Sequence, residues 1–424
     1  MNLRNSLALY GSYLLGMAGI GFTLPFLPLY LSQKGLSDGQ IGIVSTLAAL
    51  TSLAQFPIGL WADRWQWRKP FLVAALVLLA VATMLLPVAH SIVWLGVLVT
   101  LFAENGICRA VIESLAGAEA ASLAAPDRVG SALGALRFFR PVGVVIVALA
   151  GGLWAERHGV GSILIWLVAL QCLAVILGLM IHERNRLAER SIVEQSPARV
   201  GGYDRALWAF IVAMVLFHFC NAPAGVYLGL FLTRDLEAPT RVLSYAFVVS
   251  MVAWTLIVRP AGRLADRIGR RPLLIVCWVA MSARLALLAR AEAAWQVLAV
   301  QVLDGVCSGL FSVVAGTWVT DRLGDARRVS EAQVIVGTSL VFGSALGPAV
   351  SALLVEALGY RGLFGTLAIV GGLATLVLLA LVPETLRLNS ADTDLSERTT
   401  ADQARLRRST GPNLHVATAS DDHD

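Results

Sequence analysis

Long runs of uncharged apolar residues constrain this chain more than any other feature. Two of them read FLVAALVLLAVATMLLPVA, over residues 71–89, and GLFGTLAIVGGLATLVLLALV, over residues 362–382. Each has about 20 residues, the length that a helix needs to cross a hydrocarbon layer roughly 30 Å thick. Lipid offers the backbone no hydrogen-bond partners, so these runs are expected to be helical. The composition agrees, since 57% of the residues are apolar and only 14% are charged.

The chain divides into twelve candidate spans, which begin near residues 7, 39, 71, 92, 131, 162, 206, 240, 272, 294, 331 and 362. The first span follows Arg4 and lacks a small-residue cleavage site, so we interpret it as a membrane helix rather than a signal peptide. A polar stretch separates spans six and seven, and the polar C-terminal segment is expected to be disordered. The predicted parts are an N-terminal six-helix bundle, a cytoplasmic linker, a C-terminal six-helix bundle and a tail, at residues 1–182, 183–205, 206–383 and 384–424.

Basic residues indicate how the chain crosses the membrane. Most arginines and lysines fall in the loops after even-numbered spans, and few fall in the opposite loops. Because basic loops stay on the cytoplasmic side, we expect both termini and the linker to be cytoplasmic in a bacterial-type plasma (inner) membrane. The net charge of +5 is therefore an orientation signal, and no nucleic-acid partner is expected.

One charged phrase occurs twice. GLWADRWQWRKP spans residues 59–70, and GRLADRIGRRP spans residues 262–272. NGICRA at 105–110 matches DGVCSG at 304–309 with a similar offset. Each half contains six spans, so the halves share one orientation and are related by a pseudo-two-fold axis along the membrane normal. This arrangement is typical of transporters with a solute site between the halves.

The second phrase resembles in full the signature loop of the major facilitator superfamily (MFS). The first departs from it, because Trp61 replaces a leucine, Gln66 replaces a glycine and Trp67 is an extra residue. The resemblance implies an all-α membrane protein of twelve helices in two six-helix bundles, working as a secondary transporter by alternating access. We expect the glycines of the phrase to allow close helix contact and its aspartates to face a helix N-terminus or a basic partner. The candidate gating residues are Gly59, Asp63, Arg64, Arg68, Gly262, Asp266, Arg267, Gly269, Arg270 and Arg271.

Charged residues inside spans are costly and indicate function. Span four contains Glu104, Arg109 and Glu113, and span five contains Arg137 and Arg140. Arg109 and Glu113 share a helix face, and Glu113 lies at about the depth of the two span-five arginines. We expect these charges to form an interhelical ion-pair cluster. Glu104 has no partner by spacing and is the candidate proton carrier.

A second group consists of Arg284 in span nine and Asp304 in span ten, which are predicted to pair at one depth. Their surroundings, MSAR and QVLDG, resemble the lactose-permease-like and phenylpropionate-permease-like branch. In that branch the matching arginine and a histidine belong to the proton-coupling machinery, and Asp304 replaces the histidine here. Glu119 and Arg137 stand at the spacing of that branch's sugar-binding pair. The candidate cavity residues are Asn105, His218, Asn221 and Glu119.

The drug-exporter branch offers a competing resemblance. Its fourth helix carries an R-x-x-Q-G pattern, and Phe102 stands where the arginine would be, although Arg109 lies on about the same face. SALGPAVSALL, at residues 344–354, resembles the Gly-Pro motif of that branch. Proton-coupled export of a drug or metabolite is the favoured interpretation, and proton-symport uptake of a sugar, nucleoside or aromatic acid is the alternative.

The sequence lacks the motifs of several other classes of protein. The sequence has no Gly-x4-Gly-Lys-Ser/Thr phosphate loop, so ATP drive from this chain is not expected. It has neither metal-ligand spacing nor a Gly-x-Ser-x-Gly elbow, so no enzyme activity, metal or cofactor is expected. A transporter-derived sensor remains a third possibility. The expected partners are a small-molecule substrate, protons and the lipid bilayer, and the chain is expected to be a monomer.

Overall fold

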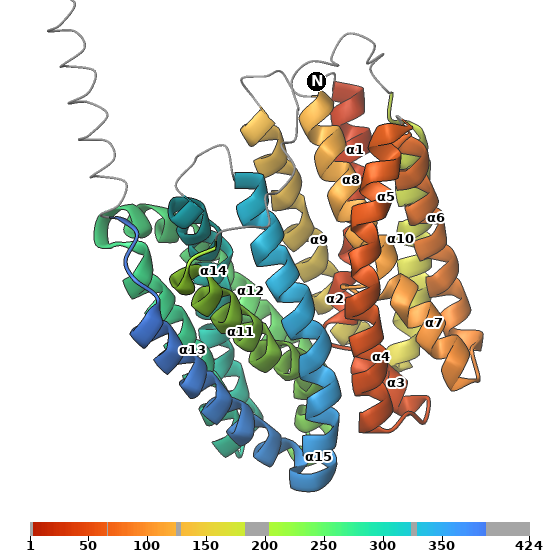
Figure 1. Ribbon diagram of the computed structural model, residues 1–424. Helices are drawn as coiled ribbons and strands as arrows, with labels where there is room; N and C mark the ends of the chain where they lie inside the picture. The colour runs from red at the N-terminus through yellow and green to blue at the C-terminus, as the bar shows by residue number, and fades with distance from the viewer. Residues whose placement is uncertain (1–2, 66, 124–128, 183–202, 324–328, 387–424) are drawn as a thin grey trace, which may run out of the picture.

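The computed structural model describes residues 3–65, 67–123, 129–182, 203–323 and 329–386. Within these ranges all regular elements are helices, and most of the long ones run along one direction (Figure 1). Ten helices in the described ranges are long and apolar enough to cross a membrane, or eleven when the bent pair Arg4–Thr23 and Leu27–Gln33 is taken as one span. The all-α prediction is confirmed.

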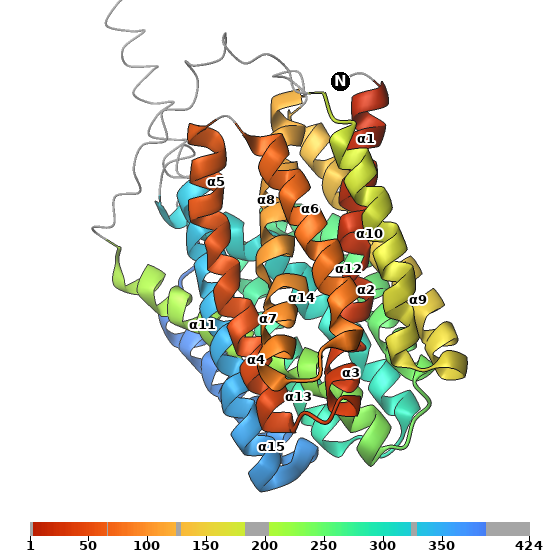
Figure 2. The same cartoon turned by 90° about the vertical axis from the view of Figure 1, so that its right-hand side faces the viewer.

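The first half of the chain forms one bundle, drawn in red to yellow in Figure 1. Within it α1 packs against α9 and α10, and α6 packs against α8 and α10. The bundle faces the viewer in Figure 2. Its α-helices are α1 (Leu3–Ala18), α2 (Ile20–Thr23), α3 (Leu27–Gln33), α4 (Asp38–Thr51), α5 (Gln55–Arg64), α6 (Arg68–Leu85), α7 (Ile92–Phe102), α8 (Ile107–Leu123), α9 (Val129–His158) and α10 (Ile163–Leu179).

The second half forms the green-to-blue bundle, in which α11 and α13 pack against α15, and α12 packs against α14. Short 3-10 and π turns extend or join several helices, among them Phe231–Asp235 at the end of α11. The α-helices are α11 (Arg205–Leu230), α12 (Arg241–Ile268), α13 (Arg270–Arg290), α14 (Ala294–Leu323) and α15 (Val329–Leu381).

Helix α15 accounts for the difference between the span count and the predicted twelve. Its 53 residues include Gly359, whose backbone is non-helical at φ 68° and ψ 179°. A side chain at this positive φ would be strained, so glycine suits the position. The chain reverses direction at the lower end of α15 in Figure 1. Counting its two arms separately, and the bent first pair as one span, gives the twelve predicted spans, whose starts lie within a few residues of the observed ones.

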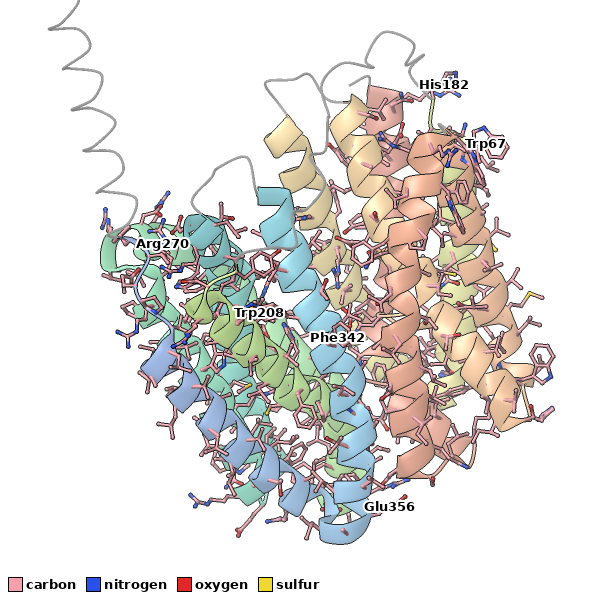
Figure 3. The ribbon with its side chains drawn as sticks, in the orientation of Figure 1. Trp67, His182, Trp208, Arg270, Phe342 and Glu356 are labelled. Atoms are coloured by element: carbon pink, nitrogen blue, oxygen red, sulfur yellow. The ribbon has the colours of Figure 1, made fainter. Side chains whose placement is uncertain are left out.

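The bundle ends define two faces of the molecule. Figure 3 labels Arg270 near one end and Glu356 at the other, and we call these ends the Arg270 face and the Glu356 face. Between the bundles, α4 packs against α15, α9 against α12 and α3 against α11. The close approach of α4 to α15 depends on Gly42, where a Cβ would lie 2.6 Å from the Pro348 carbonyl oxygen.

The glycines of the repeated phrase do not provide such close approach. A Cβ at Gly59 would lie 3.9 Å from Ser114 Oγ, and one at Gly262 would lie 3.9 Å from Val313 Cγ1. Both are ordinary van der Waals distances, so the expectation of a glycine-dependent contact at these two positions is wrong. The tight helix contacts occur elsewhere, as at Gly305, where a Cβ would lie 2.4 Å from the Ser250 carbonyl oxygen.

The segment after α15 is fastened to the start of α13. Glu384 accepts hydrogen bonds from the backbone N–H groups of Arg270 and Arg271, both at 3.0 Å. Thr385 is fully buried and donates to Asp321 at 3.1 Å. A disordered tail starting at Glu384 was expected, but residues 384–386 are packed, because the N-terminal N–H groups of α13 need acceptors. Residues 387–424, like most of the predicted linker, lie outside the described ranges.

The hydrogen bonds that Glu384 accepts at the start of α13 predict a pH-dependent contribution to stability. Burial alone raises the pKa of the Glu384 carboxyl, but the N–H groups of Leu386, Arg270, Arg271 and Thr385 lower this pKa below its ordinary value overall. A carboxyl with a depressed pKa in the folded state stabilises the protein above its unfolded-state pKa, and that contribution is lost as the pH falls through the folded pKa. We expect Glu384→Ala to cost about 1 kcal/mol at neutral pH, like the loss of a helix cap.

Thermal unfolding of purified protein at several pH values tests this expectation. The Tm difference between wild type and Glu384→Ala should shrink as the pH falls below about 4. Glu292→Ala, an exposed carboxylate in a loop at the opposite face, is the control and should show little effect at any pH. A Tm difference independent of pH would exclude the Glu384 charge as its cause.

Candidate functional site

A cavity of about 700 Å³ lies between the two bundles. Residues from α2, α4, α9, α11, α12 and α14, among other elements, contribute to its wall. Most of the lining is apolar, but charged side chains enter from both sides. The charged residues that line the cavity are Glu104, Glu113, Arg137, Arg140, Arg284 and Asp304.

A break in span four brings Glu104 and Asn105 to the cavity. Helix α7 ends at Phe102 and α8 begins at Ile107. Gly106 is needed in the break, because a Cβ there would lie 2.3 Å from the carbonyl oxygen of Thr100. The uncoiled backbone thus carries a carboxylate and an amide at membrane depth. Irregular backbone of this kind is tolerated where it lines a cavity.

Arg140 joins two carboxylates. Its Nη2 lies 2.7 Å from Glu104 Oε1, and its Nη1 lies 3.6 Å from Glu113 Oε2. The Tyr13 hydroxyl donates to Glu113 Oε2 at 2.6 Å. The predicted pairing of Glu113 with a span-five arginine is confirmed for Arg140. The expectation that Glu104 has no partner is wrong, because the break in span four turns its carboxylate towards α9. Arg137 lines the cavity and forms no ion pair with any described residue.

Arg109 does not join this cluster, contrary to the prediction. Its side chain is fully buried. Its Nε donates to the Phe102 carbonyl at 2.8 Å, and its Nη1 donates to the carbonyls of Gly16 and Met17 at 3.1 and 3.3 Å. These carbonyls lie at the C-terminal ends of α7 and α1, where helical acceptors lack partners and the helix dipole is negative. Arg109 therefore holds the breaks in spans one and four.

The second bundle contains the predicted pair. Arg284 Nη1 lies 2.8 Å from Asp304 Oδ1, and Arg284 is almost fully buried. Arg284 also donates to Asn221 Oδ1 at 2.7 Å and to Gln301 Oε1 at 3.2 Å, and Ser250 donates to Asp304. Sequence reasoning missed Ser250 and Gln301. The sequence did contain an indication for Gln301, because this residue lies three residues before Asp304 and therefore on the same helix face.

The remaining cavity candidates divide into two groups. Asn105, His218 and Asn221 line the cavity. The His218 ring meets Phe311 edge-on with centroids 4.6 Å apart, so it presents both an aromatic and a polar surface. Glu119 does not line the cavity. It is almost fully buried near the end of α8, so its predicted contact with a solute is not supported.

The two bundles are joined by polar contacts near the Glu356 face. Asp38, the first residue of α4, pairs with Arg234 at 2.9 Å and accepts from the Tyr360 hydroxyl at 2.7 Å. Arg234 also donates to Ser32 Oγ at 2.6 Å. Nearby, Arg241 pairs with Glu156 at 2.9 Å. These contacts hold the two bundles together at this end. No local sequence pattern marks these contacts, because the residues that form them lie far apart in sequence.

Comparisons with known proteins agree with this architecture. The profile of the MFS_1-like family matches residues 6–366. The chain belongs to this family. It is 26% identical to an uncharacterised MFS-type transporter of Mycobacterium tuberculosis over 375 residues, 85% of this chain and 89% of that protein. It is 24% identical to the multi-drug resistance efflux pump PmrA of Streptococcus pneumoniae serotype 4 over 379 residues, 86% and 91% of the two chains.

Solved structures of MFS transporters share the fold. The nucleoside transporter NupG superposes with a TM-score of 0.77 at 17% identity, covering 90% of this chain and 99% of its own. A bacterial homolog of the human lysosomal transporter Spinster, in an inward-facing and occupied conformation, gives 0.64 at 16% identity, covering 88% and 95%. The protein is thus a multi-pass MFS transporter. The expectation that it is no enzyme is confirmed by these relatives.

The two MFS signature phrases occupy equivalent positions in the two bundles. In the second, Arg270 pairs with Asp266 at 3.2 Å and with Asp321 at 2.9 Å, so the predicted basic partner of Asp266 is Arg270. Gly269, with φ 101°, joins α12 to α13. In the first phrase, α5 ends at Arg64 and α6 begins at Arg68. The side chain of Asp63 and the residue Gln66 lie outside what the structure describes.

The contacts of Arg109 predict a strong effect of one added methyl group. A Cβ at Gly19 would lie 2.3 Å from Arg109 Nη2, while the Gly19 backbone is already helical. We expect Gly19→Ala to displace the guanidinium from its carbonyls and to cost about 2 kcal/mol or more, since hydrogen bonds to charged groups contribute roughly 1.5–3 kcal/mol each.

The matched control is Gly372→Ala, where an added Cβ meets no atom within 4 Å. This helical substitution should leave stability unchanged or raise it by up to about 1 kcal/mol. Thermal unfolding of the purified variants measures both effects. Equal stability of the two variants would contradict the placement of Arg109 beside Gly19.

The Arg284–Asp304 pair predicts partial rescue by charge exchange. Either single change, Arg284→Asp or Asp304→Arg, leaves two like charges together and should cost about 3–5 kcal/mol. The double variant restores one pair, and the amides of Asn221 and Gln301 can turn to donate to an aspartate at position 284. It should therefore yield more folded protein than either single variant.

Folded yield by size-exclusion chromatography and Tm are the measurements. Reversal of the Arg241–Glu156 pair, which is more exposed, is the control. Its single variants should cost less than about 1 kcal/mol. A double variant no better than the worse single variant would contradict direct coupling between Arg284 and Asp304.

Proposed function

We propose that this protein is a secondary active transporter that moves a small organic solute by alternating access, driven by protons. The observation that carries the proposal is the cavity between the bundles, which has intramembrane charges on both walls and interbundle ion pairs at one end. Alternating access requires two states, each closed at a different face, and the ion pairs at one end correspond to the first of them. Opening that closure and forming a new one near the Arg270 face would give the second.

The charge arrangement supports proton coupling. Arg140 is shared by two carboxylates, Glu104 and Glu113, whereas Asp304 is the one described carboxylate that pairs with Arg284. Binding of a proton to any of the three changes which ion pairs hold and so can bias one conformation over another. The ion pairs lie within one bundle each, so a proton there changes the cavity wall without first separating the bundles.

The solute proposal is an apolar or amphipathic molecule, and the direction is export. The cavity wall is mainly apolar, with aromatic side chains such as Phe217, Phe311 and Trp254 beside a few polar groups. The efflux pump PmrA, one of the relatives, supports the same direction. Uptake of a nucleoside by proton symport is the second candidate. The amides of Asn105 and Asn221 in the wall could bond a base or sugar, and the fold neighbour NupG is a nucleoside transporter.

The orientation of the protein in the membrane is part of the same proposal. The Arg270 face carries most of the basic residues of the loops, so the positive-inside rule makes it the cytoplasmic face, with both termini on that side of a bacterial plasma membrane. The cavity, closed at the Glu356 face, then opens inward. We further propose that one chain suffices for transport.

A solute screen followed by transport assays tests the function. A ligand that binds the folded state raises its Tm by mass action, so apolar cations, drugs, nucleosides and aromatic acids are compared in one screen. Hits are then followed in proteoliposomes with an imposed pH gradient. Gradient-driven antiport of an apolar hit supports export, and symport of a nucleoside supports the alternative. Binding without any gradient-driven movement would favour a sensor over a transporter.

If the cavity carboxylates carry the coupling proton, replacing one should impair pH-driven accumulation of the substrate more than substrate exchange. Asp304→Asn should lose at least about tenfold in pH-driven accumulation yet keep part of its substrate exchange. The amide still accepts a hydrogen bond from Arg284, but it carries no proton for coupling.

The comparison uses counterflow and gradient-driven flux in the same proteoliposomes, with Glu104→Gln beside Asp304→Asn. Glu292→Gln, in a loop outside the cavity, controls for the loss of a carboxylate and should behave as wild type. Full gradient-driven transport by both cavity variants would remove these two carboxylates from the coupling mechanism.

A further inference from the structure

A second pocket lies at the Arg270 face of the first bundle, away from the cavity. It has a volume of about 460 Å³. Arg4 of α1, Lys69 of α6 and His182, just after α10, line one part of it. The rest is formed by apolar residues, Ile176 and Leu179 of α10 and Met180 and Ile181 directly after it. Three segments that are distant in sequence therefore converge on a site with basic and apolar parts.

The basic part of the pocket carries two cations, Arg4 and Lys69. Neither Arg4 nor Lys69 forms an ion pair with a described residue, and no carboxylate is among the residues that line the pocket. Lys69 lies in the first turn of α6, where the helix dipole adds positive potential. Two cations that converge on one pocket and have no ion-pair partner among the described residues are suited to an anionic ligand.

The backbone holds this geometry in place. Asn5 Nδ2 donates to the His182 carbonyl at 3.1 Å, and the His182 N–H donates to Asn5 Oδ1 at 3.1 Å. This reciprocal pair fastens the segment after α10 to the first turn of α1. His182 is thereby held close to Arg4, so the pocket is built by tertiary contacts rather than by one flexible side chain.

The depth of the pocket matches that of lipid phosphates. Trp65 and Trp67 flank the start of α6 and are 51% and 57% exposed, and tryptophan side chains concentrate at the headgroup level of a membrane. Figure 3 labels Trp67 and His182 at the same end of the first bundle. Below the basic groups, Ile176 and Leu179 are 55% and 57% exposed, as expected of residues that face acyl chains.

We propose that this pocket binds the phosphate headgroup of an anionic phospholipid. The headgroup phosphate contacts Arg4 and Lys69, and the acyl chains lie along the exposed apolar side chains of α10. Basic pockets between helices at the cytoplasmic side of a membrane are suited to such headgroups. A free phosphate has the same charge chemistry but would leave the apolar half of the pocket unused, so the lipid is the better fit.

The first test measures lipid binding by the purified full-length chain in a neutral detergent. Phosphatidylglycerol, phosphatidylcholine and inorganic phosphate are titrated separately, and bound lipid is counted by native mass spectrometry with Tm as a second readout. Phosphatidylglycerol should bind and raise the Tm, whereas phosphatidylcholine and inorganic phosphate should not. Equal effects of inorganic phosphate would assign the pocket to a soluble anion and overturn the lipid proposal.

The second test compares two variants that lose the same charge at the same face. Arg4→Gln with Lys69→Gln should weaken phosphatidylglycerol binding by about 30-fold, because each basic residue at a membrane surface contributes roughly fivefold. Arg205→Gln with Arg263→Gln, in the other bundle, should leave most of the binding intact. If the two double variants lost phosphatidylglycerol binding equally, the binding would depend on the overall positive charge of this face and not on this pocket, which would overturn the proposal.

A third measurement uses the wild-type chain and so does not depend on the folding of a variant. A phosphatidylglycerol analogue with a photoreactive headgroup should label the peptides that contain Arg4, Lys69 or His182, as read by mass spectrometry. Labels spread over the basic loops of both bundles would contradict a defined site.

Discussion

The structure depends on one constraint, which is that a polar group at membrane depth must find its partner within the protein. Arg109 meets this constraint in an unusual way. Among the described residues it has no carboxylate partner, and its guanidinium donates hydrogen bonds to the carbonyls at the ends of α1 and α7. Arg109 therefore supplies donors to three carbonyls, those of Gly16, Met17 and Phe102, where spans one and four are broken. The break in span four in turn carries Glu104 and Asn105 to the cavity, so the position of the Glu104 carboxylate depends on the contacts of Arg109.

The polar contacts are arranged in two separate sets. Within the bundles, Arg140 joins Glu104 and Glu113, and Arg284 joins Asp304, Asn221 and Gln301. Between the bundles, the ion pairs gather at the Glu356 face around Asp38 and Arg234. Each bundle can thus move as a unit without breaking these ion pairs, because both partners of each pair lie in the same bundle. The contacts that must break for such a movement include the Asp38–Arg234 and Glu156–Arg241 ion pairs, whose arginine side chains are 43% and 47% exposed.

Sequence reasoning succeeded where periodicity and depth carry the information. The pairing of Arg284 with Asp304 follows from counting residues inward from opposite faces, since a helix rises a constant 1.5 Å per residue. The same count placed Glu113 near Arg140. The count failed for Glu104 and Arg109, because it assumes an unbroken helix. The break between Phe102 and Ile107 turns these side chains away from the directions that an ideal span four would give them.

The sequence by itself determined the all-helical membrane architecture, the two-fold repeat and the family, because hydrophobic length and a repeated charged phrase are local properties. The tertiary structure decided which charges meet and where the bundles touch. It brought Glu384 to the start of α13, and Asp38 to Arg234 and Tyr360. It also placed Arg4, Lys69 and His182 around one pocket. The partners in these groups are separated by tens to hundreds of residues, and only the packing of helices against one another sets the distances between them.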